Sequence, residues 1–339
     1  MTDTPRTLGF RMPAEWEPHE ATWLAWPHNQ EDWPGKFEPI AWVYCEIVRK
    51  LAEVERVRIL VQDEELEEEA RRKLSKSGAN LHAVEFVRCP TDRVWTRDYG
   101  PIFVKNAEGE VAITDWRFNG WAKYENWKND DAAPYALAKR FKMRRWRPNL
   151  VLEGGSIDVN GAGLLMTTEE CLLSPVQARN PGVSMVQIER ALRDYLGVDR
   201  ILWLGRGIAG DDTHGHVDDL ARFVNVDTVV VVTEPDRCDP NYEPLRENRE
   251  ILRRHPVRTV ELPSPRPVIF DGQRLPASYA NFYIANGLVL VPTFNDPADR
   301  VALDTLRRLF PDREVVGIHA VDLVWGLGTL HCMTQQQPK

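Results

Sequence analysis

The chain has 339 residues, of which 43% are hydrophobic and 28% are charged, an ordinary globular composition that excludes fibrous, collagen-like and disordered proteins. The net charge of −8 argues against a general nucleic-acid binder and suits a small cationic ligand. No apolar run approaches the roughly 20 residues of a membrane span, and no early segment resembles a signal peptide.

Six segments show the apolar spacing or charge order of helices. The first, 39–53, is the clearest, because its apolar residues recur at helical spacing. The second, 64–76, is polar but acidic at its start and basic at its end, as the helix dipole favours. Shorter helical patterns follow at 131–142, 184–196, 245–254 and 297–309.

Short runs rich in β-branched residues, bounded by Gly, Pro, Asp or Asn, predict strands between these helices. They lie at 57–62, 111–118, 163–168, 200–204, 227–233, 267–270, 282–291 and 314–318. Alternation of helices and strands from end to end predicts an α/β fold. The best loop candidate, 235–246, is too short for an interdomain linker, so we expect a single domain over residues 1–339. No plain sequence repeat is visible.

The five cysteines are odd in number and form no Cys-x-x-Cys pair. With no secretory signal before them, they predict a reduced, cytoplasmic protein in which most cysteines are small buried residues.

Two polar segments with glycines at strand ends are candidate sites. Residues 95–101 (WTRDYGP) read as a shaped loop after an extended piece, in which Asp98 either serves a site or caps backbone donors. In residues 152–156 (LEGGS), two glycines after Glu153 either allow close approach to a ligand or form a hairpin turn. The spacings of phosphate and dinucleotide loops are absent there.

Residues 211–219 (DDTHGHVDD) hold two histidines and four aspartates. In an extended segment His214, His216 and Asp218 would share one face and could supply zinc ligands, although the other histidines show no paired spacing to complete such a site. A metal-free site would use His216 as acid and base, with Asp218 beside it.

Two further segments lie near the end of the chain. Residues 278–283 (SYANFY) are explained by a strand and a turn. In residues 325–336 (WGLGTLHCMTQQ), a glycine-rich loop leads to Cys332, which is either a buried structural cysteine or a nucleophile activated by a nearby imidazolium.

Together these segments resemble the agmatine deiminase and bacterial peptidylarginine deiminase family of guanidine-modifying enzymes. The resemblance spans nearly the whole chain in the family's motif order, with the cysteine last. The matching segments are 12–19, 23–27, 95–101, 118–121, 152–155, 215–218 and 331–336. The resemblance implies an α/β fold of the pentein type, a five-bladed pseudo-symmetric propeller of ββαβ-like units.

The family's chemistry fits these residue types. A guanidinium group presents its N–H donors in a fixed fork, to which a carboxylate can bind through two parallel hydrogen bonds. By resemblance, Asp98 and Asp218 hold the guanidinium, the Cys332 thiolate attacks its carbon, and His216 protonates the departing ammonia. His216 then activates the water that hydrolyses the amidino-cysteine intermediate. The resemblance implies neither a metal nor a cofactor.

The resemblance also implies substrate-binding positions. Trp95 would line the substrate channel, Glu153 would support the pocket, and Asp212 would lie near the far end of the substrate. Gly326 and Gly328 belong to the loop that delivers Cys332.

The chain departs from the family's pattern in places that concern the substrate tail. Agmatine deiminases commonly have Asn where His214 and Asp219 stand. The loop before the cysteine differs at Thr329 and Leu330, and residues 116–127 (WRFNGWAKYENW) differ from the usual Phe-Asn-Ala-Trp-Gly-Gly pattern.

The sequence therefore predicts hydrolysis of a guanidino group, with agmatine converted to N-carbamoylputrescine and ammonia as the favoured reaction of polyamine (putrescine) biosynthesis. The alternatives are a peptidylarginine or free-arginine deiminase, a zinc hydrolase using His214, His216 and Asp218, and a silent guanidine binder. The expected partner is a small cationic guanidino substrate, with no nucleic acid and no membrane. Since family members are often dimers or larger, a homo-oligomer is also an expectation.

Overall fold

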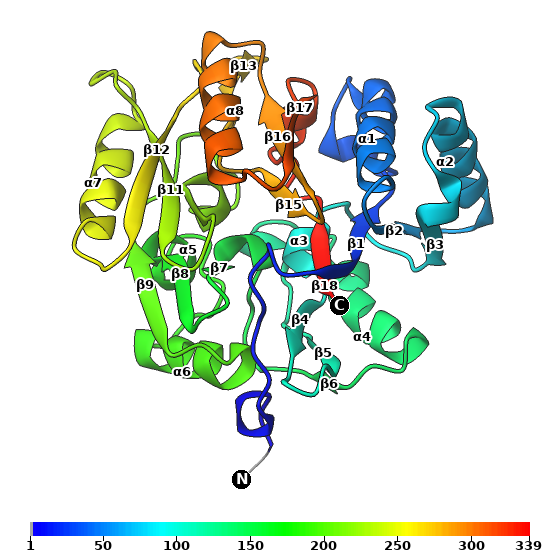
Figure 1. Ribbon diagram of the computed structural model, residues 1–339, viewed down its shortest axis with the longest axis horizontal. Coiled ribbons are helices and arrows are strands. Elements are labelled where there is room, and N and C mark those ends of the chain that lie inside the picture. Colours follow the sequence, from blue (N-terminus) through cyan, green and yellow to red (C-terminus); the bar gives the residue numbers. More distant parts are fainter. Residues whose placement is uncertain (1–2) are drawn as a thin grey trace.

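The computed structural model describes residues 3–339, and Figure 1 shows their helices lying around several small, separate sheets. Among these residues, the strands form five sheets of three or four strands and one two-stranded hairpin. The fold is therefore α/β with mixed sheets.

Four of the sheets follow one pattern. Two consecutive strands pair antiparallel, helical chain follows, and a third strand pairs parallel with the second. The four units are β4 (Ile102–Lys105), β5 (Val111–Thr114), α4 (Lys128–Arg140) and β6 (Arg145–Trp146); β7 (Asp158–Val159), β8 (Leu164–Thr168), α5 (Glu169–Leu173), α6 (Met185–Leu196) and β9 (Arg200–Leu204); β10 (Ala221–Phe223), β11 (Thr228–Thr233), α7 (Tyr242–Leu252) and β12 (Arg258–Pro263); and β15 (Tyr283–Ala285), β16 (Leu288–Thr293), α8 (Pro297–Leu309) and β17 (Glu314–His319).

The fifth sheet joins the two ends of the chain. Its strand order is β18 (Gln335–Pro338), β1 (His19–Ala25), β2 (Arg56–Val61) and β3 (Val84–Arg88). Helix α1 (Phe37–Leu51) connects β1 to β2, and α2 (Glu64–Lys76) connects β2 to β3. In Figure 1 the red strand β18 lies beside the blue strand β1, with which it pairs antiparallel.

The remaining elements are short. They are α3 (Thr96–Tyr99), the hairpin of β13 (Ile269–Phe270) and β14 (Gln273–Arg274), and the 3-10 turns Arg6–Leu8, Gln30–Asp32, Leu81–Ala83, Gly120–Ala122, Gly154–Ser156, Val217–Asp219 and Leu323–Gly326.

Local signals explain where the predicted helices begin. The Asp63 carboxylate accepts the Leu66 backbone N–H at 2.9 Å and caps α2. Asp296 caps α8 in a reciprocal capping box with Asp299, and Pro297 occupies the first turn, where its missing N–H costs nothing. The predicted bounds of both helices, 64–76 and 297–309, are confirmed.

Two of the predicted local structures are wrong. The single strand expected over 282–291 is a hairpin of β15 and β16, which turns at Gly287 in the left-handed region (φ 72°). The loop expected over 95–101 contains the short helix α3. The other helices and most of the predicted strands are present with shifted or shortened bounds. The strands that were not predicted are β1, β3, β4, β6, β7, β10, β12, β14 and β18.

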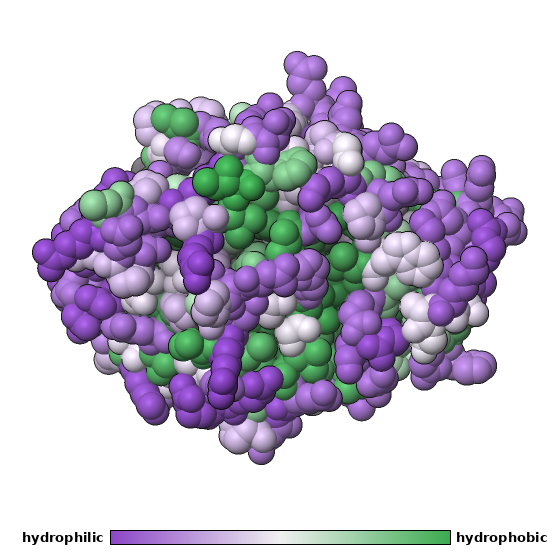
Figure 2. Space-filling model, turned by 90° about the horizontal axis from the view of Figure 1, so that it is seen from above, coloured by the Kyte–Doolittle hydropathy of each residue, from purple (hydrophilic) through white to green (hydrophobic). Residues whose placement is uncertain are grey.

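Three apolar clusters fill the spaces between the sheets and their helices. Figure 2 shows mostly hydrophilic side chains over the face seen from above, with hydrophobic side chains gathered near its middle. None of the helices within residues 3–339 is long and apolar enough to cross a membrane. All five cysteines are free thiols, and only Cys238 is exposed.

Candidate active site

The predicted site residues converge on one cavity of about 310 Å³. Asp98 and Cys332 reach its surface, together with Trp95, Gly326 and Gly328. His216, Asp218 and Glu153 are fully buried behind that surface. The structure thus brings together segments that lie more than 200 residues apart in the chain.

Asp98 is presented by α3, whose first two residues bind the segment that carries the cysteine. The Arg97 backbone N–H donates to the Cys332 carbonyl at 3.1 Å, and the Thr96 hydroxyl donates to the Met333 carbonyl at 2.8 Å. The Asp98 carboxylate accepts hydrogen bonds from Trp121 Nε1 at 2.9 Å and from the Gly155 backbone N–H at 3.1 Å. These contacts orient a buried carboxylate toward Cys332.

The segment around His216 is folded rather than extended, so the prediction of one shared face is wrong. His214 and Gly215 both take left-handed backbone conformations (φ 62° and 98°), and a 3-10 turn follows at Val217–Asp219. This bend directs His214 to the Ser174 hydroxyl, 3.1 Å from its Nε2 atom. His216 and Asp218 instead lie together in the interior, where His216 Nδ1 is 4.0 Å from Asp218 Oδ1.

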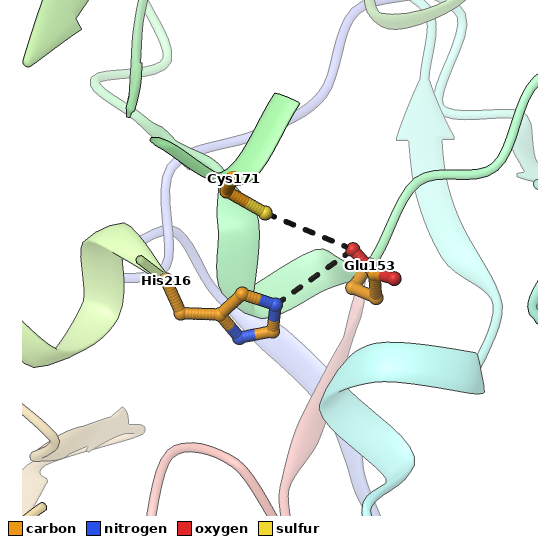
Figure 3. A group of neighbouring side chains, drawn as sticks. All are labelled: Glu153, Cys171 and His216. Atoms are coloured by element: carbon orange, nitrogen blue, oxygen red, sulfur yellow. Dashed lines mark hydrogen bonds and ion pairs between the residues drawn. The ribbon is translucent and has the colours of Figure 1, made fainter. Parts of the chain in front are cut away.

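The ligand set proposed for zinc is therefore not formed. Among the described residues, the group whose possible ligand atoms lie within 4.8 Å of one another is Glu153, Cys171 and His216 (Figure 3). Glu153 in that group is already paired with Arg179, whose Nε donates to Glu153 Oε1 at 3.0 Å. A fixed guanidinium beside this carboxylate opposes a second cation at the same place.

Cys332 is held by Asn281, a residue that the sequence explained only as part of a strand and turn. Asn281 Nδ2 donates to Cys332 Sγ at 3.1 Å, and its Oδ1 accepts from the Thr329 hydroxyl at 2.7 Å and from the His331 backbone N–H at 3.0 Å. One amide therefore fixes both the sulfur and the loop before it. No sequence pattern distinguishes this Asn from an ordinary turn residue.

The loop glycines are required by close packing. A Cβ on Gly328 would lie 2.8 Å from the Trp95 ring, and one on Gly326 would lie 2.6 Å from the Trp33 indole. A Cβ on Gly155 would enter the site itself, 2.6 Å from His216 Nδ1 and 2.8 Å from Asp98 Oδ1. The absence of a side chain in the Glu-Gly-Gly segment thus lets its backbone lie close to the site, as one of the two interpretations of this segment predicted.

The four central side chains are neighbours. Cys332 Sγ lies 3.8 Å from Asp218 Oδ2, and His216 Nδ1 lies 3.7 Å from Asp98 Oδ1. Within the described residues, Asp218 Oδ1 and both ring nitrogens of His216 are buried without a hydrogen-bond partner. Carboxylate oxygens that face inward beside a thiol form a site suited to a planar cation with several N–H donors.

The local charges shift the pKa values of these groups in opposite directions. Burial, together with Asp218 and Glu153, raises the pKa of Asp98 to about 6, against the opposing charge of His216. Burial followed by the charges of Asp218, Asp219 and Asp98 holds the pKa of the Cys332 thiol well above its usual value.

For His216, the burial penalty is outweighed, chiefly by the Asp98 charge, so that its pKa lies well above the usual value. Burial would raise the pKa of Glu153, but Arg179 and His216 lower it to about 2. The site at neutral pH therefore holds a protonated imidazole, ionised carboxylates and a neutral thiol.

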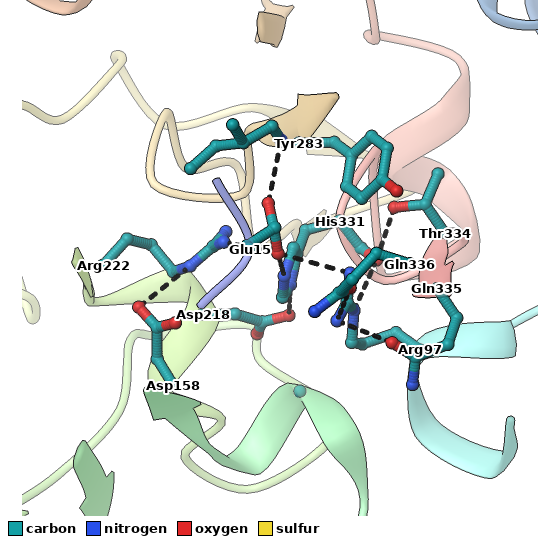
Figure 4. Close-up of polar contacts among 12 residues, drawn as sticks. Glu15, Arg97, Asp158, Asp218, Arg222, Tyr283, His331, Thr334, Gln335 and Gln336 are labelled. Atoms are coloured by element: carbon teal, nitrogen blue, oxygen red, sulfur yellow. Dashed lines mark hydrogen bonds and ion pairs between the residues drawn. The ribbon is translucent and has the colours of Figure 1, made fainter. Parts of the chain in front are cut away.

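A buried network of charges supports Asp218 from behind (Figure 4). His331 lies between two carboxylates, with Nδ1 2.7 Å from Asp218 Oδ2 and Nε2 2.7 Å from Glu15 Oε2. Arg222 donates to the same Glu15 oxygen at 2.9 Å, and Arg97 approaches it at 3.4 Å. Sequence reasoning missed these roles, although Glu15 lies in a matching motif and His331 directly precedes Cys332.

Asp212 lies at another part of the cavity lining, but its carboxylate is not free. Lys123 Nζ binds Asp212 Oδ1, and the Tyr124 hydroxyl donates to Asp212 Oδ2 at 2.7 Å. Trp95 lies in the lining as expected and packs against Trp33, with ring centroids 5.5 Å apart. The structure thus gives Asp212 a partner that the sequence did not predict.

The chain is similar to known proteins over nearly its whole length. Residues 11–338 match the family model described as Porphyromonas-type peptidyl-arginine deiminase. The agmatine deiminase of Pseudomonas aeruginosa is 39% identical, and the match covers 99% of this chain and 98% of that protein.

Two solved structures of agmatine deiminases are similar to the whole chain. That of Enterococcus faecalis superposes with a TM-score of 0.93 at 33% identity, covering 100% of this chain and 98% of its own. That of C. jejuni, solved with substrate bound, has a TM-score of 0.90 at 32% identity and covers 97% and 96% of the two chains.

Proposed function

We propose that this chain, which belongs to the Porphyromonas-type peptidyl-arginine deiminase family, hydrolyses the guanidino group of agmatine to N-carbamoylputrescine and ammonia. The observation that supports this reaction best is the convergence of two buried carboxylates, an imidazole and a thiol on one cavity. The full-length similarity to agmatine deiminases supports agmatine as the substrate.

The substrate guanidinium enters between Asp98 and Cys332 and is held by the carboxylates of Asp98 and Asp218. Each carboxylate accepts N–H groups of the planar cation, and Asp98 is itself kept in place by Trp121 and Gly155. The incoming positive charge offsets the carboxylates that raise the pKa of Cys332, so substrate binding promotes loss of the thiol proton to solvent water, from which the released ammonia takes it up as ammonium.

In the first half-reaction, the Cys332 thiolate attacks the guanidinium carbon and forms a C–S bond. His216, whose raised pKa keeps it protonated, gives its proton to the departing nitrogen as the C–N bond breaks and ammonia leaves. The product of this step is an amidino-cysteine intermediate. Asp98 stabilises the imidazolium before the transfer, with 3.7 Å between His216 Nδ1 and Asp98 Oδ1.

In the second half-reaction, His216 is neutral and accepts a proton from water. The resulting hydroxide attacks the same carbon and the C–S bond breaks. The remaining hydroxyl proton passes to the departing sulfur, which leaves a neutral ureido product, the Cys332 thiol and protonated His216 as at the start. Glu153 and Arg179 fix His216 from its other side, where Glu153 Oε2 is 3.7 Å from His216 Nε2.

We also propose that the five mixed sheets are the blades of a pentein propeller, forming a single domain over residues 1–339. Their strand pairing supports this arrangement, since four sheets share one antiparallel and one parallel pair, and the fifth contains the same two pairs and one further parallel pair. The catalytic side chains would then be contributed by the inner ends of several blades.

The test is mass spectrometry of the products formed from agmatine, arginine and an arginine-containing peptide, with wild type and Cys332→Ala compared side by side. We expect conversion of agmatine by wild type and a loss of at least about 10³-fold in the variant, as is typical for removal of a covalent nucleophile. Conversion of arginine or of the peptide instead would keep the chemistry and replace the substrate. Activity retained by Cys332→Ala would overturn the mechanism.

A further inference from the structure

Lys123 and Asp212 form a contact across the chain that the reaction does not use. Lys123 Nζ binds Asp212 Oδ1, although the two residues are 89 positions apart. The Lys123 ammonium also lies 5.5 Å from the centroid of the Tyr124 ring, and the Tyr124 hydroxyl binds the other oxygen of Asp212. Tyr124 and Asp212 both line the cavity that contains Asp98 and Cys332.

The segment that carries Lys123 reaches two parts of this cavity. Gly120, Trp121 and Ala122 are consecutive residues with left-handed backbone (φ 63°, 57° and 54°), which is costly for residues with side chains and persists only where the surroundings enforce it. The turn places the Trp121 indole on Asp98 and sends Lys123 and Tyr124 to Asp212. Gln177 Nε2 ties the two sides together by donating to the Trp121 and Asp212 carbonyls.

We propose that Lys123 is a resident cation at the tail end of the pocket, which the distal ammonium group of a dicationic guanidine must displace from Asp212. This inference rests on the proposed function and identifies Lys123 as a specificity-determining residue. A substrate ammonium at this place would need a carboxylate and an aromatic face. The Lys123 ammonium already binds the Asp212 carboxylate and lies over the Tyr124 ring.

The pair is suited to such an exchange because it is weak enough to open. The Lys123 side chain is 44% exposed and that of Asp212 is 15% exposed, so solvent reduces the strength of the ion pair. Lys123 can remain solvated after displacement, because its long side chain already lies at the surface.

One other ion pair in the lining has a similar arrangement but is buried. Arg93 binds Asp32, and its guanidinium carbon lies 4.2 Å from the Tyr124 ring centroid. Their side chains are 9% and 0% exposed, so solvent does not weaken this pair as it weakens that of Lys123 and Asp212. Glu31 also lines the cavity, is exposed and forms no ion pair within the described residues. Glu31 is therefore the rival receptor for a substrate ammonium.

The experiment compares agmatine with 1-butylguanidine, which has the same guanidine head but lacks the distal ammonium. We expect Lys123→Met to lower KM for agmatine about two- to fivefold, the range of a partly exposed ion pair, and to raise the ratio of kcat/KM for agmatine over butylguanidine by the same factor. Lys123→Arg should keep the wild-type ratio, because it retains the charge. Lys128→Met, which removes another exposed lysine at the start of α4, is the matched control and should leave the ratio unchanged.

A double-mutant cycle identifies the partner. Asp212→Asn should raise KM for agmatine, and adding Lys123→Met to it should have no further effect on the ratio. A raised KM for agmatine in Lys123→Met would mean that the lysine only positions Asp212. An equal change of KM for agmatine and for butylguanidine in this variant would mean a general change of the pocket. Either result overturns the inference.

The failure of this inference is distinguishable from failure of the proposed function. If wild type hydrolyses agmatine but Lys123→Met leaves the ratio unchanged, only the inference fails. If Glu31→Gln raises KM for agmatine and Asp212→Asn leaves this KM unchanged, the substrate ammonium binds at Glu31. That result would also overturn the inference. If wild type hydrolyses neither guanidine, the proposed function fails and this inference fails with it.

Discussion

The individual residues of the site are held in protonation states that suit a cationic substrate. Burial and neighbouring carboxylates raise the pKa values of Asp98 and Cys332, while burial of Asp218 is outweighed by its contact with His331, so that its pKa is lowered. The concentration of negative charge around the thiol keeps it protonated until a cation arrives. In the proposed mechanism, the reactivity of the thiol is thus coupled to binding of the cationic substrate.

The first prediction concerns the pH dependence of kcat/KM for agmatine. Asp98 must be ionised to bind a guanidinium, and its pKa is raised to about 6. We therefore expect kcat/KM to fall as pH is lowered through about 6, well above the ordinary aspartate value of 3.8. Steady-state rates between pH 5 and pH 8 measure this limb, and a constant kcat/KM down to pH 5 would contradict the assignment.

The second prediction concerns Gly155→Ala. The added Cβ would lie 2.6 Å from His216 Nδ1 and 2.8 Å from Asp98 Oδ1, so the side chains that hold the guanidinium must move. We expect kcat/KM to fall by at least about 10²-fold, since small displacements of reacting groups cost that much. Gly205→Ala is the control, because its nearest neighbour, Asn248 Oδ1, would be 3.5 Å away. Equal losses in both variants would refute the steric argument.

At the scale of the elements, the sequence predicts segments better than it predicts their contacts. Helices such as α2 and α8 carry their own capping residues and charge order, so their bounds could be read from local pattern. The single strand predicted over 282–291 is wrong because Asn286-Gly287, a pair typical of two-residue hairpin turns, separates two apolar runs that form β15 and β16.

The same limit applies to the site. Asp98, His216, Asp218 and Cys332 lie in short motifs, and the structure brings them together, although their catalytic roles remain predictions. Asn281, Arg222 and Lys123 act through contacts across the chain, which no local spacing encodes. His214, His216 and Asp218 do not share the one face that was predicted, because His214 and Gly215 have left-handed backbone conformations that bend the segment.

The third prediction tests the contact between α3 and β18. Arg97 on α3 is buried, and its NH1 group donates to Gln335 Oε1 at 3.0 Å and to Gln336 Oε1 at 2.7 Å. Gln336→Ala leaves this buried cation with one fewer acceptor, so we expect the free energy of unfolding to fall by about 1–3 kcal/mol. Denaturant unfolding measures the change. Gln30→Ala, at an exposed position, is the control and should stay within about 0.5 kcal/mol of wild type.

At the scale of the whole molecule, one pairing pattern recurs in four sheets without a visible repeat in the sequence, and the fifth sheet contains it with an additional parallel strand. The pattern depends on strand order and on burial, which many sequences satisfy, so each unit has its own residues at equivalent places. The interior of the molecule contains many buried charged side chains, among them Glu15, Asp158 and Arg222. The stability of the whole molecule should therefore depend strongly on pH.

The fourth prediction is a stability maximum on the acid side of neutrality. Asp98 and Asp32 have pKa values raised to about 6 and about 7, so stability increases as pH falls through these values and the carboxylates become neutral. The pKa of Glu153 is lowered from 4.5 to about 2, so its contribution is present above 4.5 and is lost as pH falls toward 2.

We expect the melting temperature to rise as pH is lowered from 8 to about 5 and to fall below about pH 4. Calorimetry across this range measures it. Asp98→Asn removes one of the groups responsible for the rise and should flatten that part of the curve. A melting temperature that falls steadily from pH 8 downward would be inconsistent with these buried carboxylates.

The pairing of β1 with β18 has a consequence for the order in which the protein is made. A ribosome synthesises β1 early and β18 late, and Cys332 emerges only just before β18. Until then β1 lacks its antiparallel neighbour, Arg97 lacks its acceptors on β18, and the nascent polypeptide carries no nucleophile at the site. Translation therefore adds Cys332, the proposed nucleophile, after every other residue of the proposed site, so incomplete products of synthesis lack it.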